Sequence, residues 1–295
     1  MLTSSTATAL AFAGAGQAPQ RVAAITGSNK GVGFFIAVHL ATSGLFSSII
    51  LGCRDTTRGQ CAVADIRARI AADGKAEVPE IHFLPLTVGD AENHKIFARE
   101  IDKRYGKLDV LVNNAGFAFK GTDPTPFAQQ CKPTLNINFR GTVDFTQTLL
   151  PLLRKGHDPR IVNVASMAGR LAQLRSNDLQ SKFSSPSLTM AELHNLVDDF
   201  ETAALDGTHA QKGWGSSNYG LSKLALIAAT KIMAREEAAN GIKVNSCCPG
   251  YCDTDMTSHK GPRPPSDGAL NAVLPATMKN CPTGEFFQNM NVSEW

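Results

Sequence analysis

The segment from residue 22 to residue 40 constrains the fold more than any other part of the chain. Residues 22–25 are apolar and predict a buried strand, and residues 34–40 have the length and composition of a helix. A turn with three glycines joins them: Thr26-Gly27-Ser28-Asn29-Lys30-Gly31-Val32-Gly33. Glycines let the backbone approach a pyrophosphate, and the helix start offers free N–H groups. The segment predicts a dinucleotide site, with an ordinary glycine-rich strand–helix loop as the alternative.

Charge after the second strand indicates which dinucleotide is bound. Residues 48–53 predict that strand, and Arg54 and Asp55 follow it. An acid at this position binds the ribose 2′-hydroxyl of NAD, whereas an arginine accommodates a 2′-phosphate. Arg54, together with Lys30 in the glycine-rich turn, favours NADP(H). If Asp55 rather than Arg54 faced the ribose, the preference would be inverted.

Tyr219 and Lys223 lie four residues apart, a spacing that places both side chains on one face of a helix. A nearby cation favours the phenolate, so we expect the pKa of Tyr219 to fall below its usual value of about 10. Such a tyrosine can donate a proton to a carbonyl oxygen. Many surface helices carry the same pair without any catalytic role, so the pair needs support from other motifs.

Four further motifs occur in a fixed order along the chain. Asn113-Asn114-Ala115-Gly116 follows an apolar strand at 108–112, and Asn138 lies within a helical segment. Ser166 ends the strand predicted at 160–165, and Pro249-Gly250 with Thr254 follows the strand predicted at 242–247. With the glycine-rich turn and the Tyr219–Lys223 pair, these motifs resemble the short-chain dehydrogenase/reductase family from about Arg21 to Trp295.

The resemblance assigns roles to named residues. It implies a catalytic set of Asn138, Ser166, Tyr219 and Lys223. It implies the following cofactor contacts: Gly27, Ser28, Asn29, Lys30, Gly31, Val32, Gly33, Arg54, Thr87, Val88, Asn114, Ala115, Gly116, Tyr219, Lys223, Pro249, Gly250 and Thr254. It implies substrate contacts from Met167, Trp214 and Tyr251.

Within the family, the chain is similar to the monomeric, NADPH-dependent carbonyl reductases. Ser166 and Tyr219 lie 53 residues apart (219 − 166), more than in most of the family. The excess forms an insertion at about 167–215, and residues 190–204 within it predict an amphipathic helix. A comparable insertion covers the helices that related enzymes use to oligomerise, so we expect a monomer. Two positions depart from this branch: Thr87 stands where Asp is usual, and Tyr251 where Trp is frequent.

The activity implied by the resemblance is the reduction of quinones, aldehydes and ketones to alcohols. Tyr219 would donate the proton, Ser166 would hydrogen-bond the carbonyl oxygen, and Lys223 would lower the pKa of Tyr219 and bind the nicotinamide ribose. Asn138 would hold a water that connects Lys223 to solvent. A pterin or steroid reductase of the same family is one alternative. A sensor or scaffold that binds the nucleotide without catalysis is another.

The whole pattern predicts one α/β domain, a Rossmann-type doubly wound parallel sheet over residues 21–295. We expect the strands at 21–26, 48–53, 80–86, 108–112, 160–165, 242–247 and 284–288. We expect the helices at 31–43, 57–72, 91–104, 127–153, 190–204 and 217–239. Residues 261–265 predict an irregular segment at the edge of the pocket.

Composition indicates which partners and which cellular compartment to expect for this domain. The net charge of +3, without a long basic run, gives no reason to expect nucleic acid, and no segment is apolar enough to span a membrane. Residues 1–20 carry no charged side chain, which predicts a flexible extension, with an organelle signal as the alternative. We therefore expect a cytoplasmic protein.

The cysteines and histidines show no metal-binding spacing, so we expect no metal. Cys53 and Cys61 are interpreted as small buried hydrophobic residues. For Cys247, Cys248 and Cys252, which cluster around Pro249-Gly250, burial and a reactive thiol at the pocket rim are both open.

Overall fold

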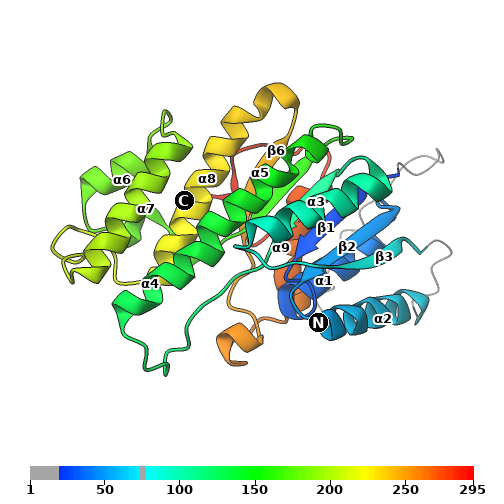
Figure 1. The fold of residues 1–295 in the computed structure, drawn as a ribbon, viewed down its shortest axis with the longest axis horizontal. Helices are drawn as coiled ribbons and strands as arrows, with labels where there is room; N and C mark the ends of the chain where they lie inside the picture. Colours follow the sequence, from blue (N-terminus) through cyan, green and yellow to red (C-terminus); the bar gives the residue numbers. More distant parts are fainter. Residues whose placement is uncertain (1–19, 73–77) are drawn as a thin grey trace, which may run out of the picture.

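A computed structural model describes residues 20–72 and 78–295; the predicted extension, apart from residue 20, lies outside these residues. Eight strands form one sheet in the order β3-β2-β1-β4-β5-β6-β7-β8 (Figure 1). All neighbouring strands are parallel except the last pair, β7 and β8. The strands are β1 (Val22–Thr26), β2 (Ser48–Cys53), β3 (Glu80–Pro85), β4 (Val110–Asn113), β5 (Arg160–Val164), β6 (Lys243–Cys248), β7 (Phe286–Gln288) and β8 (Asn291–Ser293).

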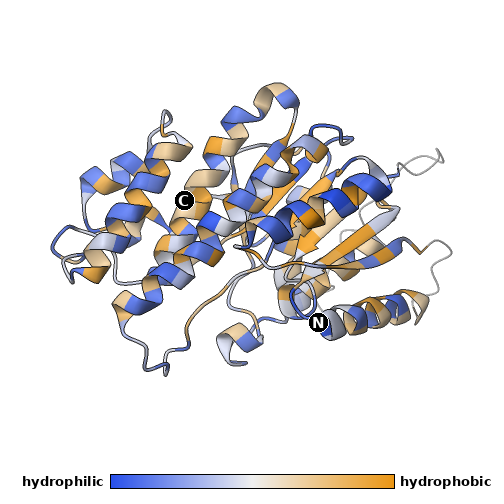
Figure 2. Ribbon diagram, viewed as in Figure 1, coloured by the Kyte–Doolittle hydropathy of each residue, from blue (hydrophilic) through white to orange (hydrophobic). Residues whose placement is uncertain are grey.

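The central strands are buried on both faces, as a parallel sheet between two helix layers requires. Alternate side chains of β1 enter different cores: Val22 and Ala24 pack on one side of the sheet, and Ala23 and Ile25 on the other. Figure 2 is consistent with this, since the central strands are mostly coloured hydrophobic while the outer helices alternate between hydrophobic and hydrophilic residues.

Helices cover both faces of this sheet. One layer contains α1 (Gly31–Thr42), α2 (Thr56–Ala72) and α9 (Pro265–Thr277). The other contains α3 (Ala91–Tyr105), α4 (Phe127–Leu135), α5 (Thr142–Leu153) and α8 (Asn218–Glu236). The insertion adds α6 (Asn177–Ser184) and α7 (Met190–Leu205), which lie at the end of the molecule opposite α2 (Figure 1). The predicted doubly wound α/β fold is confirmed. Within the described residues, no helix is long and apolar enough to cross a membrane.

The seven predicted strands are confirmed, whereas strand β8 and helices α6 and α9 were not predicted. Strand β8 has only three residues, and both Asn291 and Val292 are exposed, so its sequence carries no buried pattern. Helix α6 is eight residues long, too short to repeat a hydrophobic period clearly. Helix α9 begins at Pro265, inside the segment predicted to be irregular; residues 261–264 before it are irregular as predicted.

The helix predicted at 127–153 is interrupted. A π-helical turn, η1 (Asn136–Gly141), separates α4 from α5. The hydroxyl of Thr142 donates to the carbonyl of Ile137, five residues earlier, at 3.1 Å. A Cβ on Gly141 would lie 2.7 Å from the backbone nitrogen of Gly89, so the chain passes this point only with glycine. Such turns within helices often mark functional sites, and this one carries Asn138.

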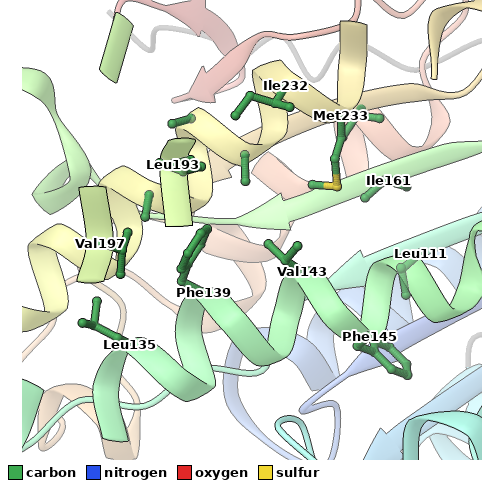
Figure 3. Packing of buried hydrophobic residues seen from close by; sticks show 14 of the residues in the cluster. Leu111, Leu135, Phe139, Val143, Phe145, Ile161, Leu193, Val197, Ile232 and Met233 are labelled. Carbon is green, nitrogen blue, oxygen red and sulfur yellow. The ribbon is translucent and has the colours of Figure 1, made fainter. Parts of the chain in front are cut away.

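The insertion is part of the core rather than an appendage. Leu193 and Val197 of α7 are fully buried and face Leu135 and Phe139 of α4 and η1 (Figure 3). Arg140, in the same π-helical turn, pairs with Asp198 and Glu201 of α7. The insertion therefore packs directly against the turn that contains Asn138.

Candidate active site

A cleft of about 540 Å³ lies at the carboxyl ends of the central strands. Most of the residues predicted to contact the cofactor line it: Gly27, Asn29, Lys30, Gly31, Val32, Gly33, Arg54, Thr87, Val88, Asn114, Ala115, Gly116, Tyr219, Lys223, Pro249 and Thr254. A second hollow of about 430 Å³ adjoins it. Residues shared by both include Val32, Ala165, Tyr219, Pro249 and Thr254, so the two hollows meet at Tyr219.

Two of the predicted cofactor residues do not line the cleft. Ser28 is fully buried, and its hydroxyl donates to the carbonyl of Ile25 at 2.9 Å, so the side chain stabilises the turn from within. Gly250 lines the second hollow instead. The sequence placed both residues in the right motifs but could not indicate which way each one faces.

The glycine-rich turn is packed against the end of β4. Gly27 has a left-handed backbone (φ 64°), and a Cβ there would lie 2.9 Å from the Cα of Ala115. A Cβ on Gly33 would lie 2.3 Å from Nδ2 of Asn114 and 2.5 Å from the carbonyl oxygen of Gly27. That same Nδ2 donates to the carbonyls of Thr26 and Gly27 at 2.9 and 3.1 Å. The two loops therefore hold one another in place with no room for larger residues.

The start of α1 suits an anionic group. Its N-cap, Lys30, makes no side-chain capping hydrogen bond, and the first turn contains no acidic residue. By contrast, α3, α6, α7 and α8 are capped by Asp90, Ser176, Thr189 and Ser217. Free N–H groups and the positive end of the helix dipole favour a phosphate. The uncapped helix start and the crowded glycines together fit a dinucleotide.

Arg54, rather than Asp55, lines the part of the cleft that is expected to hold the adenine ribose. Arg54 is exposed and lines the cleft, whereas Asp55 does not. The carboxylate of Asp55 accepts a hydrogen bond from the backbone N–H of Arg58 at 2.9 Å, at the start of α2. Lys30 also lines the cleft, where it pairs with Asp255. Arg54 and Lys30 therefore both line the cleft, whereas the carboxylate of Asp55 is engaged at the start of α2.

Three of the four predicted catalytic residues meet where the two hollows join. Ser166 follows β5, and its hydroxyl is a hydrogen-bond partner of Tyr219 in the first turn of α8. Lys223, one turn further along α8, lies with its ammonium 5.7 Å from the centroid of the Tyr219 ring. That ammonium is buried and donates to the carbonyl of Val164 at 2.8 Å. An acid, a hydrogen-bonding hydroxyl and a cation therefore share one side of the site.

The expected fall in the pKa of Tyr219 is not seen. Burial of the ring raises the pKa of Tyr219 to about 12, and the hydrogen bond from Ser166 opposes this only in part. Burial also lowers the pKa of Lys223 to about 8. Charge pairing alone predicted the wrong direction, because burial disfavours the charged phenolate and is the largest influence on the pKa of Tyr219. Tyr219 therefore stays protonated well above neutral pH, as a proton donor requires.

Asn138 supports the site from the π-helical turn. Its amide oxygen accepts from the backbone N–H of Phe117 at 2.7 Å, and its Nδ2 donates to the carbonyl of Phe117 at 2.8 Å. Nδ2 also donates to the hydroxyl of Ser222 at 3.0 Å, beside Lys223. The side chain thus holds the loop after Gly116 against α8. Its predicted contact with a water stays a prediction.

Only one of the three predicted substrate residues lies in the second hollow. Tyr251 lines it and is 55% exposed. Trp214 is buried in the core between Phe183 and Phe200, with ring centroids 6.2 and 5.6 Å away. Met167 packs on a small cluster with Ile227 and Cys248 and lines neither hollow. The expectation for Trp214 is wrong, because the insertion buries the ring.

Several residues around both hollows escaped the sequence analysis. Lys120 bonds the carbonyl of Asp255 and the hydroxyl of Ser258, at 3.1 Å for the latter. His259 pairs with Asp253 at 2.7 Å and with Asp255 at 2.9 Å, and these hydrogen bonds raise its pKa. The segment 253–260 is thereby tied to both hollows. The only signal in the sequence was a histidine with two acids shortly before it.

Most of the cysteines are buried. Cys247, Cys248 and Cys252 are buried, and burial raises the pKa of Cys247 and brings that of Cys252 to about 11. This favours the interpretation of the cluster as small hydrophobic residues. Cys53 is buried as expected, but Cys61 on the outer face of α2 is exposed, contrary to the expectation.

Comparison with known proteins agrees with this geometry. The sequence model described as short chain dehydrogenase matches residues 21–190 and 206–264. Carbonyl reductase (NADPH) 1 of Homo sapiens is 39% identical over 93% of this chain and 98% of that protein. Salutaridine reductase from Papaver somniferum superposes with a TM-score of 0.80 at 27% identity, covering 90% of this chain and 99% of that one. Menthone neomenthol reductase from Mentha piperita gives a TM-score of 0.76 at 27% identity, covering 91% and 98%.

Proposed function

Because the chain belongs to the short-chain dehydrogenase family, we propose that it is an NADPH-dependent carbonyl reductase. The observation that carries the proposal is the position of Tyr219, which lines both the dinucleotide cleft and the adjoining hollow. The similarity to a carbonyl reductase over nearly the whole chain supports the reaction type. Quinones, aldehydes and ketones are the proposed substrates.

The chain's own residues handle the proton and the developing charge. When bound, the cofactor supplies the hydride. Tyr219 donates its phenolic proton to the substrate oxygen, and its raised pKa keeps that proton in place until the oxygen becomes strongly basic. Ser166 hydrogen-bonds the same oxygen and stabilises its negative charge. Lys223 binds the nicotinamide ribose and places a positive charge beside Tyr219. Asn138 holds the loop after Gly116 against α8.

The preference for NADPH over NADH is proposed to depend on Arg54 and Lys30. Replacing Arg54 by Ala removes a charge-assisted hydrogen-bond donor from the cleft. We expect the Kd for NADPH to rise by about ten- to a hundredfold, while the Kd for NADH changes little. Titration by cofactor fluorescence measures both, and Lys95→Ala on the exposed face of α3 serves as a control for loss of positive charge. Equal weakening of both cofactors would contradict the assignment.

The pKa of Lys223 predicts how the reaction depends on pH. Since kcat/KM for NADPH reports ionisations of the free enzyme, it should decrease above an apparent pKa near 8 as Lys223 loses its charge. Tyr219, with a pKa of about 12, remains protonated over this range and adds no second limb. Initial rates between pH 6 and pH 10, with circular dichroism as a check on folding, test this. A kcat/KM for NADPH that stays constant up to pH 10 would show that Lys223 does not control this step.

The proposed activity is tested by NADPH oxidation with purified protein and a panel of quinones, aldehydes and ketones, monitored at the nicotinamide absorbance. We expect turnover with NADPH that exceeds turnover with NADH. Tight NADPH binding without oxidation by any carbonyl compound would favour a sensor or scaffold.

We also propose a monomer, because α7 packs against α4 and α8, and α6 packs against α8. We expect light scattering at micromolar concentration to give a mass near 31.4 kDa. A mass twice as large would contradict the proposal.

A further inference from the structure

One glutamine of the insertion joins the two segments that carry Ser166 and Tyr219. Gln173 ends a short 3₁₀ helix at residues 171–173. Its Nε2 donates to the carbonyl of Ala168 at 2.8 Å and to the carbonyl of Gly220 at 3.0 Å. Ala168 lies two residues after Ser166, and Gly220 directly follows Tyr219. A single amide group therefore bonds both segments.

The same two residues are also held through their backbone N–H groups. The backbone N–H of Ala168 donates to the hydroxyl of Ser166 at 3.1 Å, so this residue contacts Ser166 through its N–H and Gln173 through its carbonyl. The backbone N–H of Gly220 donates to the hydroxyl of Ser217 at 2.8 Å, the cap of α8. The position of Gln173 is thus transmitted to Ser166 on one side and to the start of α8 on the other.

The space around Gln173 allows little other packing. A Cβ on Gly220 would lie 2.6 Å from Oε1 of Gln173 and 2.9 Å from the carbonyl oxygen of Ala168. A Cβ on Gly215 would lie 2.9 Å from the carbonyl oxygen of Gln173. The two acceptor carbonyls also fix the orientation of the amide, since a reversed amide would place oxygen against oxygen. The two glycines and the two acceptor carbonyls therefore fix the position of the Gln173 side chain.

We propose that Gln173 is a positioning residue that sets the separation of Ser166 and Tyr219. Gln173 lines neither hollow, so it acts through the two residues rather than on the substrate. The inference rests on the proposed function for the roles of Ser166 and Tyr219. It gives the insertion a part in the active site in addition to its cover over α4 and α8.

The first test is Gln173→Met, which keeps the length of the side chain and removes the donor. We expect kcat to fall by about ten- to a hundredfold, because a misplacement of about 1 Å can cost about a hundredfold. The Kd for NADPH should stay within about twofold, since the dinucleotide turn is untouched. Gln173→Glu, which has the same shape but faces both carbonyls with a carboxylate, is the second variant and should show a similar or larger loss. Gln180→Met is the matched control, because that amide also lies in the insertion and, among the described residues, donates to the carbonyl of Leu174 alone.

A double mutant separates positioning from general stability. If Gln173 acts through the Ser166–Tyr219 pair, Gln173→Met should cost much less in a Ser166→Ala background than in the wild type. Full additivity, an unchanged kcat, or an equal loss in Gln180→Met would overturn the proposal. Crystal structures of the wild type and Gln173→Met provide a readout that does not need turnover. An unchanged distance between Oγ of Ser166 and Oη of Tyr219 overturns it even if no carbonyl is reduced, whereas wild-type inactivity alone contradicts only the proposed function.

Discussion

Replacement of Tyr219 by Phe is expected to lower kcat for carbonyl reduction by about 10²- to 10⁴-fold, the usual contribution of a positioned acid. The phenylalanine keeps the ring and its packing but has no proton to donate. Ser166 can still hydrogen-bond the substrate oxygen, so a small residual rate should remain. The Kd for NADPH should change by less than about threefold, because the hydroxyl lies where the two hollows meet rather than in the dinucleotide turn.

Tyr105→Phe is the matched control for this variant. Tyr105 is the last residue of α3 and lines neither hollow. Its replacement by Phe removes the same hydroxyl group, but at a position away from the reacting atoms. It should retain the wild-type kcat. A Tyr219→Phe enzyme with more than one tenth of the wild-type kcat would show that another group supplies the proton.

Replacement of Gly33 by Ala is expected to raise the Kd for NADPH by a factor on the order of 10² or more. The added Cβ would lie 2.3 Å from Nδ2 of Asn114 and 2.5 Å from the carbonyl oxygen of Gly27, so the turn has to open. Opening it would remove several of the charge-assisted hydrogen bonds that we propose this turn makes to phosphate, each worth about 1.5–3 kcal/mol. Isothermal titration calorimetry with NADPH measures the effect directly.

Gly59→Ala distinguishes this effect from a general loss of stability. Its Cβ would lie 2.2 Å from the ring of Phe83, an equally severe intrusion, but Gly59 lies on α2 outside the cleft. We expect Gly59→Ala to lower the free energy of unfolding by about 1–3 kcal/mol and to leave the Kd for NADPH unchanged. If both variants bound NADPH normally, the turn would not hold the dinucleotide.

Most of the sheet and most of its flanking helices could be predicted because their signals are local and repeat. Strands such as β2 and β5 are short apolar runs, and the glycine-rich turn sits between a strand and a helix as its role requires. The elements that were missed lack this repetition. The three-residue β8 is defined only by its pairing with β7, and the π-helical turn arises from the close approach of Gly141 to Gly89.

The motifs that surround the cleft could be predicted from the sequence, but the direction in which individual side chains face could not. Order along the chain brought Ser166, Tyr219 and Lys223 together, and all three meet as expected. Which way Ser28 faces and where Trp214 is buried depend on tertiary packing, which no motif encodes. The direction of the Tyr219 pKa shift was wrong for the same reason, since desolvation is a property of the folded surroundings.

The roles of Gln173 and Arg140 show what the insertion adds to this fold. Gln173 bonds the segments of Ser166 and Tyr219, and Arg140 bonds the π-helical turn of Asn138 to α7. From the sequence, we predicted only that the insertion covers the helices that related enzymes use to oligomerise. In the structure, the insertion contacts the segments that hold Ser166, Tyr219 and Asn138, three of the four candidate catalytic residues.

The most direct test of the account follows the transferred hydrogen. Purified protein is incubated with NADPH deuterated at both C4 positions and an aromatic aldehyde or ketone, and the product is analysed by mass spectrometry. We expect an alcohol that carries one deuterium on the former carbonyl carbon, formed at a rate that collapses in Tyr219→Phe. An alcohol without deuterium, or no alcohol with any carbonyl compound despite bound NADPH, would contradict it.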